Sequence, residues 1–224
     1  MRYLFSDRQG GFSKGSYSSF NLALHVNDNP LDVQRNRELL SDMIGTENLV
    51  FMQQIHKDYI KVVDTKKPQT YPSCDALITN LKEVALVVMV ADCIPVLFYD
   101  SKKEVIAAIH AGREGVKRKI APKTVVKMRD LYGCEAKDIE VFIGASIKSC
   151  CYEIKSDVSD GFENYLHVKK DRIYLDLVSK CIDDLKSFGV KNIDVDERCT
   201  CCNKNYFSYR RDGVTGRFAG VIRL

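Results

Sequence analysis

Three side chains that bind metals well, His56, Cys93 and His110, stand at or beside the ends of apolar runs in this sequence. Cys93 follows the run at 84–91 and His110 follows the run at 105–109, so the spacing suits two neighbouring strands and their turn. Imidazole and thiolate are ligands that zinc prefers, and three protein ligands with one open position are typical of catalytic zinc. The pattern therefore predicts a metal site at the strand ends.

The same side chains fit a second chemistry that needs no metal. Cys93 would be a nucleophilic thiolate, and His110 would be the base that activates it. Asp75 and Asp92 suit carboxylates that orient an imidazole or move protons in either scheme. Turn formation and strand-end capping explain these carboxylates equally well. Residue types and spacing leave both chemistries open.

Two adjacent arginines, Arg210 and Arg211, predict an anion site. A guanidinium group can donate two parallel hydrogen bonds to phosphate or carboxylate, so the pair suits a phosphate anchor. The alternative is a solvated turn with ion pairs, because an Asp-Gly pair follows directly. His25 and His167 have no comparable surroundings, and we assign neither of them a chemical role from the sequence.

The chain has nine cysteines, and five of them gather in two short segments. Cys199 and Cys202 have the C-x-x-C spacing of metal sites, and Cys150 is adjacent to Cys151. A four-thiolate zinc site usually combines two C-x-x-C pairs, and adjacent cysteines are poorly spaced to bind one ion together. We therefore expect these cysteines to pack in the structure, with a structural zinc as the alternative.

Composition and charge limit the classes of protein to which the chain can belong. Its 224 residues are 45% hydrophobic and 29% charged, which is typical of a folded domain with a sizeable core. The net charge of +4 is too small to predict nucleic-acid binding, and it is compatible with an anionic small substrate. We find neither a signal peptide nor an apolar run of the roughly 20 residues that span a membrane. These features predict a cytoplasmic protein with reduced cysteines and no membrane partner.

Apolar periodicity, caps and turn residues predict helices and strands that mix along the whole chain. The predicted helices are at 30–44, 121–131, 158–166 and 177–188. The predicted strands are at 2–6, 49–55, 59–63, 76–79, 84–91, 105–109, 139–143, 190–195 and 218–224. We expect strands 49–55 and 59–63 to pair with each other through a tight turn, and residues 66–73 to form a loop. Because two strands are apolar throughout, we expect one α/β domain over residues 1–224, with a sheet covered on both faces.

Several segments together resemble the polyphenol oxidase or laccase-domain family. They are NLALHVNDNP (21–30), MQQIH (52–56), SCDALIT (73–79), ADCIPVLFYD (91–100), AAIHAG (107–112), GASIKSCCYEI (144–154) and FSYRRDGVTGR (207–217). The segments occur in the family's order and cover nearly the whole chain, which makes the resemblance far more specific than a metal triad alone.

The resemblance implies a layered α/β/β/α fold related to cysteine-hydrolase toxins, and a zinc-dependent enzyme acting on purine nucleosides. The implied reactions are phosphorolysis of adenosine, inosine and 5′-methylthioadenosine, together with deamination of adenosine. The implied metal ligands are His56, Cys93 and His110, and copper is the alternative to zinc. Nucleosides and phosphate are the implied partners. The family has a relative with an amidase role on cell-wall precursors, so the cysteine-hydrolase alternative stays open. A copper-dependent polyphenol oxidase is a further alternative, which the family's older name implies.

We expect four further residues in the matching segments to bind substrate. Gln53 and Asn21 lie in the MQQIH and NLALHV segments, and Arg210 and Arg211 lie in the last one. The family's usual HAGWRG segment is HAGREG here, so Arg113 and Glu114 replace a tryptophan and an arginine. Substrate preference is therefore less well defined by the resemblance than metal binding is. The sequence does not indicate an oligomeric state.

Overall fold

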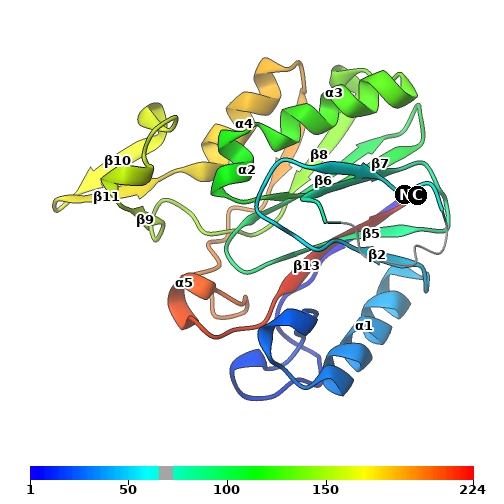
Figure 1. Ribbon diagram of the computed structural model, residues 1–224, viewed down its shortest axis with the longest axis horizontal. Helices are drawn as coiled ribbons and strands as arrows, with labels where there is room; N and C mark the ends of the chain where they lie inside the picture. Colours follow the sequence, from blue (N-terminus) through cyan, green and yellow to red (C-terminus); the bar gives the residue numbers. More distant parts are fainter. Residues whose placement is uncertain (66–72) are drawn as a thin grey trace.

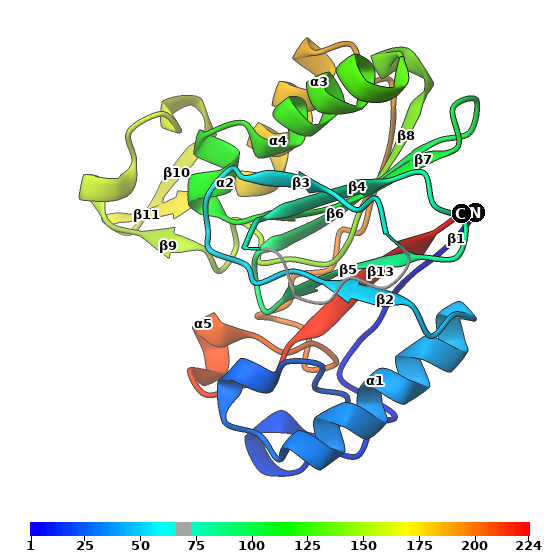
Figure 2. The ribbon, with the colours of Figure 1, turned by 45° about the vertical axis from the view of Figure 1, so that its right-hand side comes forward.

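The computed structural model describes residues 1–65 and 73–224, which form four layers with two stacked β-sheets between helices (Figures 1 and 2). The helices are α1 (Pro30–Ile44), α2 (Arg113–Lys117), α3 (Ile120–Tyr132), α4 (Leu177–Ser187) and α5 (Tyr209–Asp212). In Figure 2, α1 lies against the outer face of one sheet, while α3 and α4 cover the outer face of the other. This arrangement is the α/β/β/α fold that the family resemblance implies.

The two stacked sheets differ in size and in the order of their strands. The larger sheet runs in the order β12 (Asn192–Val195), β8 (Ile139–Ile143), β6 (Ile94–Asp100), β7 (Val105–Ala111), β4 (Ala76–Thr79) and β3 (Ile60–Val62). The smaller sheet runs in the order β1 (Arg2–Phe5), β13 (Phe218–Arg223), β5 (Ala85–Val90) and β2 (Leu49–Phe51). A third sheet of β10 (Leu166–Lys169), β11 (Arg172–Leu175) and β9 (Glu153–Ile154) projects from one side (Figure 1).

Three apolar cores separate the four layers, which explains why the central strands are apolar on both faces. Leu86 and Val88 of β5 belong to the core between the sheets, whereas Val87 and Met89 belong to the core under α1. Successive side chains of a strand point to opposite faces of its sheet. A strand between two cores must therefore be apolar at every position, as the sequence of β5 is.

β7 places His110 at the edge of the core between the two sheets. Ile106 and Ala108 of β7 belong to that core, and Ile109 belongs to the core under the helices. By the same alternation, His110 follows Ile106 and Ala108 onto the inner face of the larger sheet. Its side chain is only 2% exposed. A buried imidazole needs polar partners, because burying a polar group without them is costly.

The first helix begins and ends where its sequence predicts. Asn29 caps α1, because its side chain accepts a hydrogen bond from the backbone N–H of Leu31 at 3.0 Å. Gly45 follows the last turn with a φ of 79°, a conformation that glycine adopts without strain. Leu40 and Ile44 bury one face of the helix against the smaller sheet.

The predicted pairing of strands 49–55 and 59–63 is wrong. β2 pairs in parallel with β5, and β3 pairs in parallel with β4, so the two strands lie in different sheets. The connection between them crosses from one sheet to the other and carries His56. Periodicity shows which faces of a strand are buried, but it does not show which sheet receives the strand. β6, for which the periodicity gave no separate prediction, begins after a second crossing at Asp92.

The predicted helix at 158–166 is also wrong. The segment forms two 3-10 turns, Ser156–Val158 and Glu163–Tyr165, and then enters β10. Gly161 lies between the turns with a φ of 82°, which a continuous helix does not allow. Phe162 is 1% exposed and anchors the segment in the core under the helices, where we expected a helical stripe. The predicted loop at 66–73 lies, except for Ser73, outside the described residues.

In the described ranges 1–65 and 73–224, every helix is too short or too polar to cross a lipid bilayer.

Asn36 on α1 holds the long loop that follows β1. Its Oδ1 accepts a hydrogen bond from the backbone N–H of Phe12 at 2.8 Å. Its Nδ2 donates to Ser13 Oγ at 3.0 Å and to the backbone oxygens of Ser19 and Asn21 at 3.2 and 2.8 Å. Asn36 is fully buried, so water cannot replace these bonds if the amide is removed.

We predict that Asn36→Ala lowers the free energy of unfolding by roughly 1–3 kcal/mol, because buried polar groups lose their partners. Urea denaturation measures the change. Gln34→Ala is the matched control, since Gln34 is an exposed amide on the same helix whose Nε2 donates to Glu38 Oε1 at 3.2 Å. Equal losses of stability in the two variants would contradict the prediction.

Candidate active site

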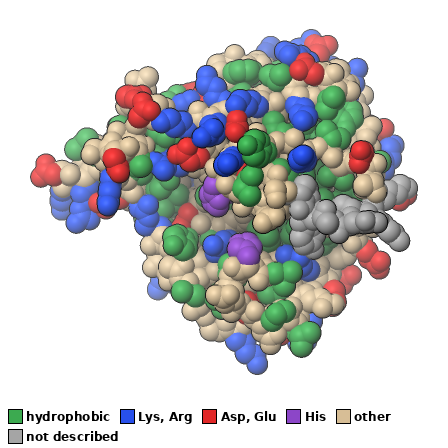
Figure 3. Space-filling model, in the orientation of Figure 1, with side chains coloured by type: hydrophobic (Ala, Val, Ile, Leu, Met, Phe, Trp, Pro, Cys, Tyr) green, Lys and Arg blue, Asp and Glu red, His purple; other side chains and the backbone are tan. Residues whose placement is uncertain are grey.

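A cavity of about 660 Å³ opens where β5 ends and β6 begins. The hollow is visible on the face shown in Figure 3, where histidine side chains lie among lysine and arginine side chains. Its walls come from segments far apart in the chain, including His25, the 52–56 connection, residues 89–93, Tyr152 and the 209–217 segment. A cavity of this size suits a small molecule such as a nucleoside.

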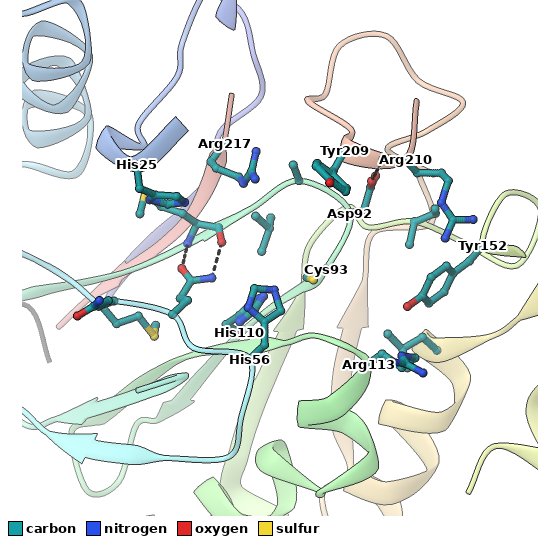
Figure 4. A pocket seen from close by; sticks show the side chains of 18 residues that line it. His25, His56, Asp92, Cys93, His110, Arg113, Tyr152, Tyr209, Arg210 and Arg217 are labelled. Atoms are coloured by element: carbon teal, nitrogen blue, oxygen red, sulfur yellow. Dashed lines mark hydrogen bonds between the residues drawn. The ribbon is translucent and has the colours of Figure 1, made fainter. Parts of the chain in front are cut away.

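His56, Cys93 and His110 meet in this cavity (Figure 4). Their ligand atoms all lie within 4.8 Å of one another. The two imidazole rings meet edge to face, with centroids 4.7 Å apart and an angle of 85° between their planes. The crossing connection after β2 supplies His56, the residue before β6 supplies Cys93, and β7 supplies His110. The structure thus brings together the three residues that the sequence selects as metal ligands.

Asp75 lies behind His110, fully buried, and orients both histidines. Its Oδ1 is 2.8 Å from His110 Nδ1 and accepts a hydrogen bond from the backbone N–H of His56 at 2.9 Å. Its Oδ2 accepts from the backbone N–H of Lys57 at 2.8 Å. Burial raises the pKa of Asp75, but the hydrogen bonds from His110 and from these backbone groups outweigh it and lower the pKa overall. Asp75 does not line the cavity and bonds the histidines from behind, so its placement suits an orienting role.

Cys93 and His110 stabilise each other's charged forms. Burial raises the pKa of Cys93, but the neighbouring His110 and His56 outweigh it and lower the pKa to about 6. Burial lowers the pKa of His110, but Cys93 and Asp75 outweigh it and raise the pKa to about 9. In the absence of a metal, the pair therefore holds a thiolate beside an imidazolium at neutral pH.

The three side chains also fit a metal ion. With Asp75 at Nδ1, His110 keeps Nε2 available as a ligand, which is how carboxylates commonly orient metal-binding histidines. Gly112 leaves the ligand atoms room: a Cβ there would lie 3.3 Å from Cys93 Sγ and 3.5 Å from His56 Cδ2. Two imidazoles and one thiolate suit zinc, and they also suit copper.

Asp92 lies in the cavity wall at the crossing between the two sheets. Its φ is 95°, a conformation that costs energy for a residue other than glycine. Hydrogen bonds compensate: Oδ1 accepts from Thr200 Oγ1 at 2.7 Å, and Oδ2 accepts from the backbone N–H of Arg210 at 2.6 Å. The Asp92 carbonyl also accepts from the backbone N–H of Ile147 at 2.9 Å. Asp92 thus fixes two other segments of the wall.

The two adjacent arginines have different places. Arg210 lines the cavity, and its Nη1 donates to the backbone oxygens of Cys151 and Glu153 at 3.3 and 2.8 Å. Arg211 points into its own turn, where it donates to the backbone oxygens of Thr200 and Tyr206, both at 2.8 Å. An anion in the cavity can therefore meet Arg210, whereas Arg211 holds the turn together.

Of Gln53 and Asn21, which we expected to bind substrate, only Gln53 lines the cavity. Gln53 lines the cavity with an exposed amide that accepts a hydrogen bond from Ser73 Oγ at 3.0 Å. Asn21 is fully buried, and its Oδ1 accepts from the backbone N–H groups of Ala23 and Arg217 at 3.0 and 2.9 Å. Asn21 lies outside the wall and fixes the backbone of Arg217, which is in the wall.

Sequence reasoning missed His25, Tyr152 and Arg217, all of which line the cavity (Figure 4). Each lies in a segment that carries the family resemblance, and this was the signal that could have found them. The spacing of residues in the sequence gave no such signal, because the cavity walls come from segments that are far apart in the chain. Burial, with a smaller effect of Arg217, lowers the pKa of His25.

A family model described as multi-copper polyphenol oxidoreductase laccase matches residues 2–224. This chain belongs to that family. The resemblance found in the sequence is thereby confirmed. The name refers to copper, and the described residues include two groups of cysteine and histidine side chains that could hold a metal ion.

Curated relatives match along nearly the whole chain. A purine nucleoside phosphorylase of Corynebacterium glutamicum is 40% identical over 233 residues, which cover 100% of this chain and 94% of the relative. A purine nucleoside phosphorylase of Mycobacterium tuberculosis is 34% identical and covers 99% of this chain, with 91% of its own length matched. Both relatives carry the name purine nucleoside phosphorylase.

Solved structures of the family share the fold. A Bacillus licheniformis protein, YfiH, superposes with a TM-score of 0.93 at 31% identity, over 98% of this chain and 91% of that one. YlmD from Geobacillus stearothermophilus superposes with a TM-score of 0.92 at 31% identity, over 99% and 92% of the two chains. The mixed α/β fold predicted for this chain is therefore confirmed.

The state of Cys93 gives a prediction for the metal-free protein. Because its pKa is about 6, Cys93 is a thiolate at pH 7, and the thiolate fraction falls as the pH falls through 6. We predict that iodoacetamide alkylates Cys93 readily at pH 7 after chelation, and more slowly below pH 6. Peptide mass spectrometry measures the rate at each cysteine.

Two controls belong to this experiment. Cys74 and Cys181 are buried thiols whose pKa burial raises to about 12, so they should stay unmodified in the same samples. Added zinc should protect Cys93, because a metal-bound sulfur is a poor nucleophile. A rate at Cys93 that does not depend on pH between 5 and 8 would contradict the thiolate–imidazolium pair.

Proposed function

We propose that this chain is a zinc-dependent purine nucleoside phosphorylase that uses the cavity around His56, Cys93 and His110. The observation that carries the proposal is one cavity of nucleoside size with the His-Cys-His group on one side and Arg210 and Arg217 on another. The relatives named purine nucleoside phosphorylase, which match over nearly the full chain, support the reaction class.

In phosphorolysis a phosphate oxygen attacks C1′ of the ribose, the bond from C1′ to N9 breaks, and the base leaves with the electron pair. The products are ribose 1-phosphate and a base that takes up a proton. The attack needs a phosphate held close to a ribose that becomes positively charged. Arg210 and Arg217 line the same cavity. Both suit the binding of this phosphate, because one guanidinium group can donate two parallel hydrogen bonds to two phosphate oxygens.

The aromatic and apolar part of the wall suits the purine. Tyr152, Ile147 and Leu177 line the cavity, and apolar lining with a few polar groups is typical of small-molecule sites. Adenosine, inosine and 5′-methylthioadenosine are the proposed substrates. In the deamination of adenosine, water replaces the amino group at C6 and ammonia leaves. When bound, zinc would supply Lewis acidity at the His-Cys-His side of the cavity.

A product assay tests the proposal. Purified protein loaded with zinc is incubated with each nucleoside, with and without phosphate, and the products are separated by chromatography. We expect free base and a pentose 1-phosphate only with phosphate: ribose 1-phosphate from adenosine and inosine, and 5-methylthioribose 1-phosphate from 5′-methylthioadenosine. We also expect inosine from adenosine without phosphate, and loss of both reactions on chelation. Absence of base and ribose 1-phosphate in the zinc-loaded samples would exclude phosphorolysis.

One observation favours a second candidate, a cysteine hydrolase or amidase without metal. Cys93, His110 and Asp75 have the order of a nucleophile, a base and a carboxylate that orients the base, with Asp75 at 2.8 Å from His110 Nδ1. This candidate predicts activity that survives chelation and is lost on alkylation of Cys93. It also predicts that Cys93→Ser leaves zinc binding unchanged, whereas the phosphorylase proposal predicts weaker zinc binding.

We predict that Arg210→Ala raises the KM for phosphate by about 10–100-fold, because a hydrogen bond to a charged group contributes roughly 1.5–3 kcal/mol. Deamination, which uses no phosphate, should keep its rate. Initial rates at varied phosphate, with inosine as nucleoside, measure the first effect. Arg129→Ala is the control, since Arg129 is an exposed arginine on α3 outside the cavity wall. Equal loss of both reactions in Arg210→Ala would contradict a phosphate-anchoring role.

A further inference from the structure

A second group of thiols lies on the outer side of the cavity wall. Cys150 and Cys151 lie in a turn after β8, and Cys199 and Cys202 lie in a turn after β12. All four sulfurs are within 4.8 Å of one another. We expected the five cysteines of these segments to pack, with a structural zinc as the alternative, and the structure gathers four of them in one group.

The spacing of the sulfurs matches a tetrahedral metal site. Zinc–sulfur bonds of about 2.3 Å place the sulfurs of a tetrahedral site about 3.8 Å apart. Cys150 Sγ lies 3.8 Å from Cys151 Sγ and 3.7 Å from Cys202 Sγ, and the last two are 3.3 Å apart. These distances are far longer than the roughly 2.05 Å of a disulfide bond. The four thiols are therefore free and gathered around one point.

The adjacent cysteines reach the same point because the chain turns sharply there. The backbone N–H groups of Cys151 and Tyr152 both donate to the Lys148 carbonyl at 2.9 Å, which closes the turn and directs both sulfurs to one side. The other turn is fixed by a bond from the Asn203 N–H to the Cys199 carbonyl at 2.9 Å. Neither turn has to rearrange to bring the thiols together.

Donors and cations around the group suit thiolates. The backbone N–H of Lys148 donates to Cys199 Sγ at 3.5 Å. Arg210 and Arg211 donate to backbone oxygens of the two turns, at Cys151 and Cys201. Four thiolates around one divalent ion carry two net negative charges, which these cations offset.

We propose that Cys150, Cys151, Cys199 and Cys202 bind a zinc ion in a closed structural site, separate from the cavity. The thiols lose their protons on binding, and the ion joins the turn before β9 to the turn after β12. Tyr152 and the carbonyl that receives Arg210 belong to the first turn, and Thr200, which bonds Asp92, belongs to the second. The ion thus fixes one wall of the cavity from outside. The site does not depend on the proposed function.

Metal analysis of neighbouring variants tests the proposal. Cys202→Ser removes an exposed ligand, and Cys201→Ser is the matched control on the same turn. We expect Cys202→Ser to lose one equivalent of zinc relative to the wild-type protein and Cys201→Ser to lose none. Hydrogen exchange should rise at residues 148–153 and 199–203 in Cys202→Ser alone. Equal zinc contents in the wild type and both variants would overturn the proposal.

Cobalt spectroscopy on Cys93→Ser tests the site without altering it. This variant lacks the thiolate of the cavity, so any intense sulfur-to-cobalt charge-transfer band belongs to the four-cysteine group. We expect a band of tetrathiolate intensity in Cys93→Ser that disappears when Cys202→Ser is added. Absence of the band in Cys93→Ser, or a disulfide among these cysteines in protein purified without oxygen, would overturn the proposal.

Discussion

The buried carboxylate of Asp75 is the interaction on which the site depends. It joins the crossing connection after β2 to β7, because its oxygens bond the backbone at His56 and Lys57 as well as the ring of His110. Its backbone oxygen also accepts from the His110 N–H at 2.7 Å. A charge buried between two sheets is tolerated only when it has several partners. The need to satisfy this carboxylate therefore brings both histidines to one place.

Asp92 holds together the segments of the opposite wall, as Asp75 holds together the segments that carry the histidines. The chain leaves the smaller sheet at β5 and enters the larger one at β6, and Asp92 marks the crossing with a strained φ. Its carboxylate bonds residues more than a hundred positions away, at Thr200 and Arg210. Two carboxylates in the same stacked pair of sheets thus have separate roles: Asp75 orients the side of the cavity with the histidines, and Asp92 holds the side with Arg210.

The sequence predicts the local elements of this fold better than their assembly. The caps of α1 and the apolar run of β5 depend on neighbouring residues, so Asn29, Gly45 and the bounds of these elements are predicted well. The pairing of β2 with β5 depends on distant segments, and periodicity does not contain it. His56, Cys93 and His110 were found because their residue types are unusual at strand ends. His25 and Arg217 were missed because their residue types and spacing do not indicate a site, although both lie in segments that carry the family resemblance. The cavity that they share forms only after both sheets stack.

The origin of the three proposed metal ligands would link metal binding to the whole fold. His56, Cys93 and His110 come from two crossings and a central strand of the larger sheet, so the unfolded chain has no comparable group of ligands. A ligand that binds only the folded state, at a free concentration of about 100 times its Kd, adds about 2.7 kcal/mol to the free energy of unfolding. If these residues hold a metal, its supply would then influence how long the chain survives proteolysis, because proteases cleave the unfolded chain. A cell short of that metal would hold a larger unfolded fraction of this protein, and so less of the protein overall.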